Sequence, residues 1–471
     1  MTGTSKALSL KEKIGYGSGD FAFVLFWATI SNQLIFFYTD VFGISAIAAG
    51  TMIMVSRLWD GVNDPMMGII ADRTQTKWGK FRPYLIWMAI PLGVMGVVTF
   101  TTPDLSPTGK LIYAWITYTL FMMIYTAANI PYSSLLAVIS PDSIERADTA
   151  SYKYVCAYAG GFVVSVSLLP MAKYFGNGSD AAGWQITLAI YGAIAAVFFL
   201  ITFLSTHERV TPPPAQKTSV GRDLKDLVAN RPWLILLIVT LFMILFIAVR
   251  SSVTTHYFKY YVQDRPLPFG LSDKKYDYVT LTSAFAGVGQ VFCIIGVLCT
   301  KWIARPLGKR RAFLILFGID VAANAVFYLF KPEQVSAMFV FQIIASFAGG
   351  PLVPLIWAMY ADTADYSEWK NGRRATGLVF SASTMSQKLG WAVGSFTVGL
   401  LLTSVGFVPN MEPSEDVKEG LRALMSVIPA VAGIISMGVM FLYKLDESAM
   451  ERIARTLEKR REGELAEVAL N

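Results

Sequence analysis

The sequence contains few charged residues and few of the side chains that most enzymes use for chemistry. Of its 471 residues, 15% are charged, two are histidine and three are cysteine. It has no HExxH zinc motif, no Gly-Lys-Ser/Thr phosphate-binding string, no serine nucleophile elbow and no cysteine–histidine cluster. A membrane-embedded hydrolase or a metal-dependent enzyme would have few candidate catalytic groups here, so we expect no enzymatic activity and no cofactor.

Apolar residues replace charged ones over most of the chain. They make up 54% of the sequence, and the mean hydropathy is +0.49, whereas soluble domains contain about 45–50% apolar and about 25% charged residues. Twelve apolar runs are each long enough to cross a bilayer as a helix of about 20 residues. The sequence therefore predicts an all-α integral membrane protein with twelve transmembrane helices. The runs are residues 20–42, 47–72, 83–101, 111–139, 154–175, 184–205, 232–261, 278–302, 311–331, 335–360, 376–405 and 423–444.

Lysines and arginines are distributed unevenly between the loops on the two sides of the membrane. If both termini are cytoplasmic, the cytoplasmic segments carry 27 of the 40 basic residues and the opposite loops carry nine. This threefold excess is typical of cytoplasmic loops, so we expect a multi-pass protein of a bacterial inner membrane, surrounded by lipid, with both termini in the cytoplasm. The excess also explains the net charge of +7 without a nucleic-acid partner, which would require a basic soluble face.

A proline-rich segment, HERVTPPPAQKTSVGRDLKDLVANR, divides the twelve runs into two sets of six. The loops ADRTQTKWGKFRPYL and CTKWIARPLGKRRAFL occupy equivalent places in the two sets and share a Gly-Lys-basic finish. Parallel half-repeats are a signature of transporters, although basic cytoplasmic loops alone could produce the similarity. We expect an N-terminal half at 1–205, a cytoplasmic linker at 206–231, a C-terminal half at 232–445 and a cytoplasmic tail at 446–471.

Two aspartates lie in the second apolar run, in the string RLWDGVNDPMMG. Asp60 and Asp64 are one helical turn apart and share a face of the helix, and a charged aspartate near mid-membrane costs about 2.5–3.5 kcal/mol. Arg57 can neutralise only one of them. The pair therefore predicts a site for Na⁺ or a proton, with a buried structural network of Arg57 and the two acids as the alternative.

Six strings occur in the order and spacing of a known transporter family: YGSGDFAF, FFYTDVFG, RLWDGVNDPMMG, DRTQTKWGKFRPY, YTAANIPYSSL and ADTADYSEWKNGRRATG. On these strings the chain resembles the glycoside-pentoside-hexuronide:cation symporters, the melibiose permease branch of the major facilitator superfamily. The resemblance implies a twelve-helix fold in two halves that exposes a central sugar site alternately to the two sides of the membrane. It also implies transport of a glycoside, pentoside or hexuronide together with Na⁺, Li⁺ or H⁺, and we expect a monomer.

The resemblance assigns the cation site to two helices. Asp60, Asn63 and Asp64 match the cation ligands of the family, and Thr126 matches a hydroxyl from the fourth helix. These four residues would be the metal ligands if the coupling ion is Na⁺. Proton coupling stays open, because a buried carboxylate beside a like charge can also hold a proton.

The resemblance also indicates a sugar site. Asp20 matches the family's sugar-binding acid, which can accept two hydrogen bonds from hydroxyls, and Tyr125 matches an aromatic residue. Asn129 stands where melibiose-type members have a second aspartate, Ser133 replaces an aromatic residue and Gly19 replaces a lysine. These differences disfavour an α-galactoside and favour a xyloside, glucoside or glucuronide, unless Asn129 only satisfies backbone groups.

Four further polar residues complete the predicted sugar site. Lys153 on the fifth helix lies near the place of a sugar-contacting arginine, and Lys388 matches a family lysine that links the C-terminal half to the site. Thr384 and Gln387 lie on adjacent turns and are expected to add hydrogen bonds. Four polar or aromatic residues of the second half belong to no motif, and packing explains each of them equally well: Arg250, His256, Asp320 and Trp357.

Charged residues at the cytoplasmic ends of the helices are candidate gates. Opposite charges on the two halves could hold the cytoplasmic side closed, and a network is required because one surface ion pair contributes only about 0–1 kcal/mol. Topology alone explains the basic residues but not the acidic ones. The N-terminal candidates are Asp72, Arg73, Lys80 and Arg82, and the C-terminal candidates are Asp362, Asp365, Glu368, Arg373 and Arg374.

One other function fits the same fold. A carrier of lysolipids or other amphiphiles would need an apolar cleft that is open to lipid. The predicted cavity instead contains Asp20, Asn129 and Lys388. A cation-coupled sugar carrier is therefore the favoured interpretation.

Overall fold

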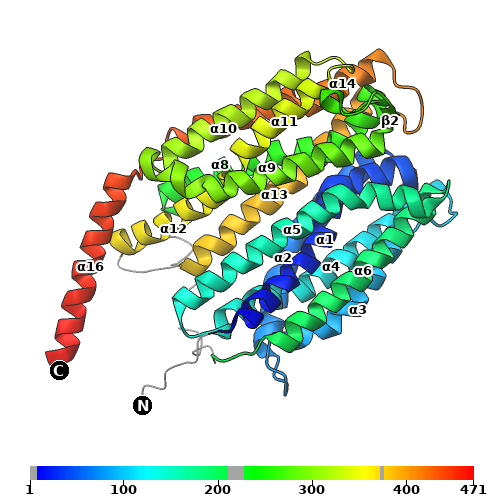
Figure 1. Cartoon of the computed structure of the whole chain (residues 1–471). Helices are drawn as coiled ribbons and strands as arrows, with labels where there is room; N and C mark the ends of the chain where they lie inside the picture. The colour runs from blue at the N-terminus through cyan, green and yellow to red at the C-terminus, as the bar shows by residue number, and fades with distance from the viewer. Residues whose placement is uncertain (1–7, 211–226, 372–375, 471) are drawn as a thin grey trace.

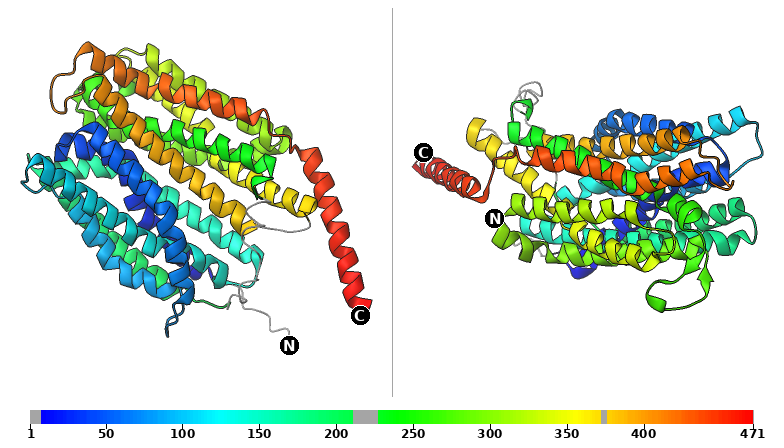
Figure 2. Two further views of the ribbon diagram at one scale, coloured as in Figure 1. Left: turned by 180° about the vertical axis from the view of Figure 1, so that it is seen from behind. Right: turned by 90° about the horizontal axis from the view of Figure 1, so that it is seen from above.

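The computed structural model describes residues 8–210, 227–371 and 376–470, and almost all of them are helical. The long helices form two groups that lie side by side, and the first and last described residues, which stand for the termini below, lie at the same end of the bundle (Figures 1 and 2). The first group contains α1 (Leu10–Phe36, continued by the π-helical turn η1, Phe37–Phe42), α2 (Ala46–Arg73), α3 (Arg82–Thr99), α4 (Pro107–Ile139), α5 (Ser143–Gly176) and α6 (Asp180–Ser205).

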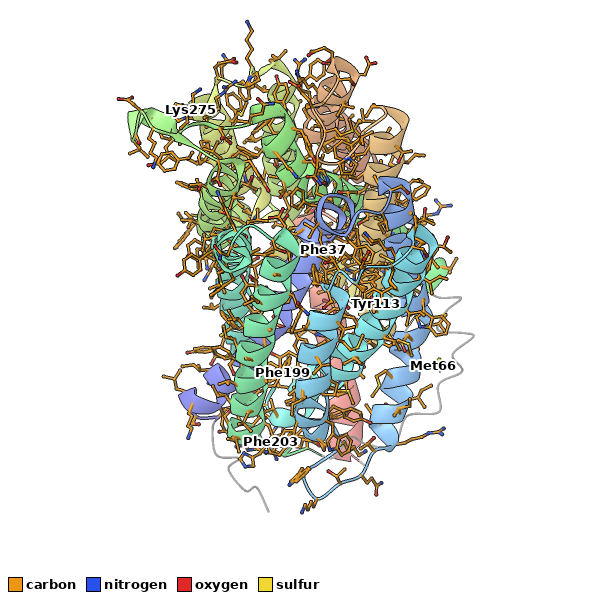
Figure 3. All side chains as sticks on the ribbon, turned by 90° about the vertical axis from the view of Figure 1, so that its right-hand side faces the viewer. Phe37, Met66, Tyr113, Phe199, Phe203 and Lys275 are labelled. Atoms are coloured by element: carbon orange, nitrogen blue, oxygen red, sulfur yellow. The ribbon has the colours of Figure 1, made fainter. Side chains whose placement is uncertain are left out.

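The second group repeats this arrangement with more interruptions. A short antiparallel hairpin of β1 (Arg265–Pro266) and β2 (Lys275–Tyr276), with the single turn η3 (Pro268–Gly270) between its strands, projects from the end of the bundle away from the termini (Figure 3). The helices are α8 (Arg231–His256, continued by η2, Tyr257–Val262), α9 (Tyr278–Leu307), α10 (Lys309–Ala325, continued by η4, Val326–Leu329), α11 (Val335–Gly349), α12 (Leu352–Asn371), α13 (Thr376–Ser404), α14 (Glu415–Met425), α15 (Val427–Met440) and α16 (Glu447–Leu470).

Most of these helices have the length and composition of membrane spans. Among the described residues, ten helical segments are long and apolar enough to cross a bilayer. The helices α2 and α13 are as long as these, carry polar residues at mid-length, and pack against each other across the boundary between the groups. Together they make twelve membrane-scale helices in the described part of the chain, and the predicted fold class is confirmed.

The outer surface of the bundle is apolar as well as the core. Phe37 and Phe199 are completely buried in the N-terminal half, whereas Met66 is 51% exposed at its outer edge (Figure 3). Ile90 on α3 is 72% exposed. Side chains of this kind on the outside of a helix bundle are expected where lipid, rather than water, surrounds the protein.

Two helices differ from the sequence-based prediction at the end that carries the termini. The first helix begins at Leu10, ten residues before the predicted run, because the Ser9 hydroxyl accepts a hydrogen bond from the Glu12 N–H while the Glu12 carboxylate accepts one from the Ser9 N–H. This capping box stabilises a polar helix start that hydrophobicity does not reveal. The tail predicted after residue 446 is also helical, as α16.

Two glutamates hold loops to the starts of helices at this same end. The Glu208 carboxylate accepts hydrogen bonds of 2.7–3.0 Å from three consecutive backbone N–H groups at the start of α3. The Glu447 carboxylate accepts one of 2.6 Å from the Lys309 N–H at the start of α10. A carboxylate at a helix N-terminus pairs otherwise unbonded N–H groups and is favoured by the helix dipole.

The two groups touch backbone to backbone at the end away from the termini. A Cβ atom on Gly50 of α2 would lie 2.8 Å from the carbonyl oxygen of Ser395 on α13. One on Gly399 of α13 would lie 2.3 Å from the carbonyl oxygen of Ala46. Neither position has room for a side chain, so glycine allows α2 and α13 to close this end of the bundle.

Candidate functional site

The predicted acidic pair lies at mid-length of α2. Asp60 is completely buried, and Nη1 of Arg57 is 3.9 Å from its Oδ2. Neither carboxylate oxygen of Asp60 has a hydrogen-bond partner among the described residues, and Nδ2 of Asn63 has none either. A buried carboxylate without partners is costly, so this cluster has the capacity to bind a further polar or charged group.

Asp64 connects α2 to helices of both halves. Its Oδ1 accepts a hydrogen bond of 3.2 Å from Thr126 Oγ1 on α4, and its Oδ2 forms an ion pair with Lys388 on α13. The structure therefore gathers the four predicted cation ligands around one stretch of α2. It also adds Lys388, whose ammonium group is a fixed cation already in contact with one of the two acids.

The ligand types in this cluster suit a small monovalent cation or a proton better than a transition metal. No group of three His, Cys, Asp or Glu side chains within the described ranges is arranged to hold a metal ion. The predicted set contains two acids, with one hydroxyl and one amide oxygen beside them. Oxygen donors of this kind are ligands for hard cations.

The predicted sugar-binding acid faces a predicted base. Asp20 on α1 lies 3.7 Å from Lys153 Nζ on α5, and the two side chains are 13% and 21% exposed. Lys153 Nζ also lies 5.4 Å from the centroid of the Tyr132 ring. A Cβ on Gly19 would come within 2.7 Å of the edge of this ring, so a lysine at this position would have to displace Tyr132.

Aromatic rings join the Asp20 pair to the acidic cluster on α2. The Arg57 guanidinium carbon lies 4.2 Å from the centroid of the Trp27 ring, a cation–π contact. Tyr125 and Trp391 lie 6.1 Å and 6.4 Å from Trp27. Sequence reasoning identified Tyr125 but missed both tryptophans. Their spacing was the available signal, because Trp27 follows Asp20 by about two helical turns on the same face.

For three other residues of the predicted sugar site, the described part of the structure gives burial but no contact with the Asp20 pair. Asn129 is half-buried on α4, one turn beyond Tyr125, and its amide makes no hydrogen bond to the described residues. A purely backbone-satisfying role for Asn129 therefore has no support in this structure. Gln387 is half-buried beside Lys388, and Thr384 is exposed one turn earlier on α13.

The predicted gate residues have partners within their own halves wherever the structure shows those partners. The Arg82 guanidinium donates a hydrogen bond of 2.6 Å to the Phe203 carbonyl and stacks 4.6 Å from the Phe203 ring. Asp362 forms an ion pair with Lys309. Of the remaining candidates, Asp72 and Arg73 are exposed, Lys80, Asp365 and Glu368 are half-buried, and Arg373 and Arg374 lie outside the described residues.

A second buried acid, Asp40 in η1, closes the opposite end of the bundle. Its carboxylate accepts hydrogen bonds from Lys259 Nζ, at 2.7 Å, and from the Tyr260 hydroxyl, and His256 Nε2 lies 3.3 Å from it. The side-chain amide of Asn410 donates a 2.8 Å hydrogen bond to the Asp40 carbonyl. These four partners belong to the C-terminal half, so this Asp40 cluster fastens the halves together, and it gives His256 a role that the sequence had not suggested.

Known proteins resemble this chain in sequence and in fold. Residues 15–447 match the family described as MFS/sugar transport protein. The chain is 36% identical over 437 residues to the inner membrane symporter YicJ of Escherichia coli, covering 92% of this chain and 91% of that protein. It is 34% identical over 447 residues to the isoprimeverose transporter of Lactiplantibacillus pentosus, covering 94% and 90% of the two. A crystal structure of a D-xylose-proton symporter has a TM-score of 0.61 at 15% identity, covering 92% of this chain and 97% of its own, which supports the fold alone.

Proposed function

Because the chain belongs to the MFS/sugar transport family and is a secondary transporter of the sugar type, not an enzyme, we propose that it is a cation-coupled symporter for a glycoside, pentoside or hexuronide. The observation that carries the proposal is the completely buried carboxylate of Asp60, whose oxygens have no hydrogen-bond partner in the described chain. A transported Na⁺ or proton supplies the missing partner.

Cation binding acts on the contact between the halves. A cation held between Asp60 and Asp64 competes with the ammonium group of Lys388 for the carboxylate of Asp64. Release of Lys388 changes how α13 is held against α2, since the ion pair is a direct link between these helices. The ion therefore alters the equilibrium between conformations only through its different affinity for each of them.

The Asp20 pair is suited to a polyhydroxylated substrate. The Asp20 carboxylate accepts hydrogen bonds from sugar hydroxyls, and Lys153 donates them to hydroxyl or carboxylate oxygens. Tyr125 and Trp27, whose ring centroids lie 6.1 Å apart, supply aromatic faces for the apolar side of a sugar ring. Trp27 also lies against Arg57 on the cation side, so the aromatic pair connects the two proposed sites.

Thermodynamic coupling between the cation site and the sugar site allows the sugar to be accumulated against its gradient. If the bound cation raises sugar affinity, the sugar raises cation affinity by the same factor. Inward movement of one positive charge releases about 2.3 kcal/mol per 100 mV of membrane potential. At a one-to-one stoichiometry this free energy is equivalent to about a fiftyfold concentration of sugar.

The conformation is consistent with alternating access. Two contacts join the halves at different depths. The Asp64–Lys388 ion pair lies at the middle of the bundle, and the Asp40 cluster lies at the end away from the termini. The distribution of basic residues assigns the termini to the cytoplasm. On that assignment the halves are fastened together on the outer side, and the protein faces inward.

Uptake into proteoliposomes tests the proposal. Labelled xyloside, glucoside and glucuronide are offered with a Na⁺ gradient alone, a pH gradient alone, or neither, and an ionophore that collapses each gradient is the control. We expect one gradient to drive at least one substrate above its external concentration. Equilibration without accumulation under both gradients would contradict cation coupling.

A further inference from the structure

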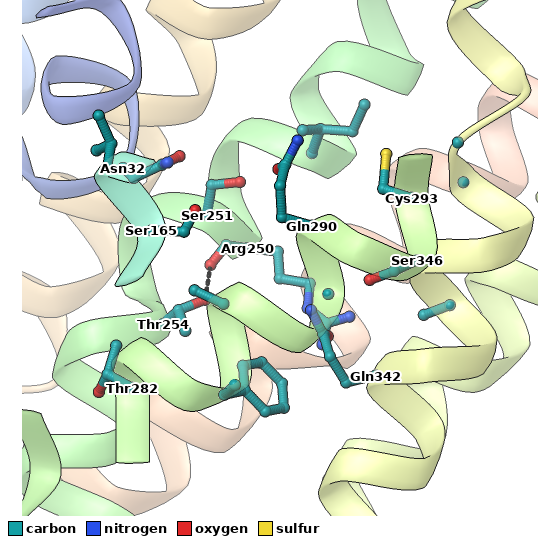
Figure 4. Close-up of a pocket in the computed structure, with 18 of the residues that line it drawn as sticks. Asn32, Ser165, Arg250, Ser251, Thr254, Thr282, Gln290, Cys293, Gln342 and Ser346 are labelled. Carbon is teal, nitrogen blue, oxygen red and sulfur yellow. Dashed lines mark hydrogen bonds between the residues drawn. The ribbon is translucent and has the colours of Figure 1, made fainter. Parts of the chain in front are cut away.

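A cavity of about 380 Å³ lies between the halves, next to α8, α9 and α11, and none of the predicted sugar-site residues lines it (Figure 4). Its volume lies within the range of about 300–1,000 Å³ that is typical of small-molecule sites. Polar side chains from four helices line its wall: Arg250, Gln290, Asp320, Asn324 and Gln342. The mechanism proposed above uses none of them.

Arg250 and Asp320 give the cavity one charge of each sign. Arg250 Nη2 donates a hydrogen bond of 2.7 Å to Gln342 Oε1, and its guanidinium carbon lies 4.6 Å from the Phe327 ring centroid. Asp320 Oδ1 accepts a hydrogen bond of 2.7 Å from Asn324 Nδ2. No ion pair of 4.0 Å or less joins the two side chains in the described residues. The cavity is therefore charge-balanced, with donors and acceptors on separate helices.

Several polar groups of the wall have no partner within the protein. Asn324 Oδ1 and Thr282 Oγ1 are buried without a hydrogen bond in the described part of the chain. The Gln290 amide also makes none there, and this half-buried side chain lies at the cavity in Figure 4. Unpaired donors and acceptors together match hydroxyl groups, because each hydroxyl donates one hydrogen bond and accepts up to two.

We propose that this cavity is a second hydroxyl-binding subsite, which holds one ring of a two-ring glycoside while Asp20 and Lys153 hold the other. The proposal rests on the proposed function, since it requires a sugar substrate. Gln290 and Arg250 donate hydrogen bonds to the second ring, and Asp320 accepts them. A carboxylate on this ring gives no advantage, because Asp320 already balances Arg250.

The two sites lie close enough along α5 to share one substrate. Lys153 contacts Asp20, and Tyr158 lines the cavity. These residues are five positions apart on one helix, which is about 7.5 Å along its axis and about 140° around it. Further along α5, a Cβ on Gly161 would lie 3.4 Å from Gln290 Nε2, so a two-ring sugar would have to follow α5 from Lys153 to reach Gln290. From Tyr158 the cavity continues along α5 as far as Ser165 and beyond.

Gln290→Leu tests the subsite with the least disturbance, because the Gln290 amide has no partner to lose. Equilibrium binding is measured for matched sugars: methyl α-xyloside and isoprimeverose, methyl β-glucoside and cellobiose, methyl α-galactoside and melibiose. We expect the unsubstituted protein to bind at least one two-ring sugar more tightly than its one-ring match. The variant should lose about three- to tenfold of that affinity, the effect of one hydrogen bond, and keep its one-ring affinity.

A matched control distinguishes the cavity from a general effect of removing an amide. Gln185 lies on α6, where its Nε2 donates a hydrogen bond of 3.0 Å to Thr101, and it does not line the cavity. Gln185→Leu should leave the affinities for one-ring and two-ring sugars unchanged. An equal loss in both variants would overturn the assignment of Gln290.

Cys293 gives a second measurement, because it lines the cavity and is partly accessible. In Cys156→Ser/Cys299→Ser protein, a two-ring sugar should slow the reaction of Cys293 with N-ethylmaleimide, and its one-ring match should not. In Cys293→Ser/Cys299→Ser protein, the remaining Cys156 lies three residues after Lys153 on α5, and a Cβ on Gly17 of α1 would lie 2.9 Å from its Sγ. Both sugars should slow the reaction of Cys156.

The possible results separate this proposal from the proposed function. If the second ring changes neither the affinity nor the reaction of Cys293, the cavity is not a subsite, although one-ring binding at Asp20 would still stand. If no sugar of the panel binds at all, the proposed function fails as well.

Discussion

Asp40 and Asp60 are both buried aspartates next to basic residues, but their surroundings differ. Asp40 is held by Lys259, Tyr260 and His256 at the end of the bundle away from the termini. Asp60 lies at mid-length of α2, and its two oxygens have no hydrogen-bond partner in the described residues. The same residue type thus accepts several hydrogen bonds in one region, whereas in the other it accepts none and has only Arg57 at 3.9 Å.

The difference separates a structural role from a binding role. A buried charge whose hydrogen bonds are all made within the protein is part of the packing, and removing it leaves its partners unpaired. A buried carboxylate without hydrogen-bond partners is retained despite its cost, which is typical of a ligand or ion pathway in a membrane protein. We therefore interpret the Asp40 cluster as the fastening of the halves and Asp60 as a site for the transported cation.

Removing the unpaired charge should have the largest effect on transport. Asp60→Asn is expected to abolish uphill sugar accumulation and to leave some downhill exchange, because the cation site loses one of its two acids. Accumulation ratios in proteoliposomes under an imposed gradient measure this, and Asp104→Asn, in an exposed loop, is the control. Wild-type accumulation by Asp60→Asn protein would exclude Asp60 from the cation site.

Removing the paired charge should instead have the larger effect on stability. Asp40→Asn leaves Lys259 without its buried counter-ion, a change that typically costs about 3–5 kcal/mol. We expect its thermal unfolding midpoint in detergent to fall further than that of Asp60→Asn. Equal shifts in the two variants would remove the distinction between a structural and a binding acid.

Asp20 extends the comparison to an acid with a single partner. Asp20→Asn should weaken sugar binding by about 1.5–3 kcal/mol, the contribution of a charge-assisted hydrogen bond, and should affect cation binding much less. Isothermal titration with sugar and with Na⁺ separates the two effects. Unchanged sugar affinity with lost cation affinity would reverse the roles assigned to α1 and α2.

Adding an acid should give the smallest effect. Asn129→Asp places a hydroxyl-accepting carboxylate one turn from Tyr125, so preference should move partly towards galactosides and away from glucuronides through like-charge repulsion. Lys153 and Lys388 still attract an anion, and we expect the ratio of glycoside to glucuronide uptake to change by less than about tenfold, or 1.4 kcal/mol. An unchanged ratio would show that other residues set the specificity.

The membrane spans and the α2 cluster could be predicted because each leaves a local signal. Apolar runs of sufficient length give the spans, and Asp60 and Asp64 stand out because acids are rare in such runs. The resemblance to a family then added Lys388, whose contact with Asp64 the structure shows. Whether these residues bind a cation and a sugar stays a prediction.

The Asp40 cluster and the cavity beside α8, α9 and α11 left no comparable signal. Asp40 and Asn410 are 370 positions apart, and only the packing of the two halves brings them together. Arg250 and Asp320 were visible as charges in apolar runs, but the sequence does not show that Gln290 and Gln342 come from neighbouring helices to the same space. The early start of α1 depended on a capping box rather than on hydrophobicity.

The glutamates at the two helix starts have a consequence for measuring motion. Glu208 attaches the beginning of the linker to α3, and Glu447 attaches the beginning of α16 to α10. Each junction is therefore held by hydrogen bonds to a helix of its own half. A spin label placed beside each junction would therefore be attached to one half, and the distance between the two labels would report how far the halves separate at the end of the bundle that carries the termini.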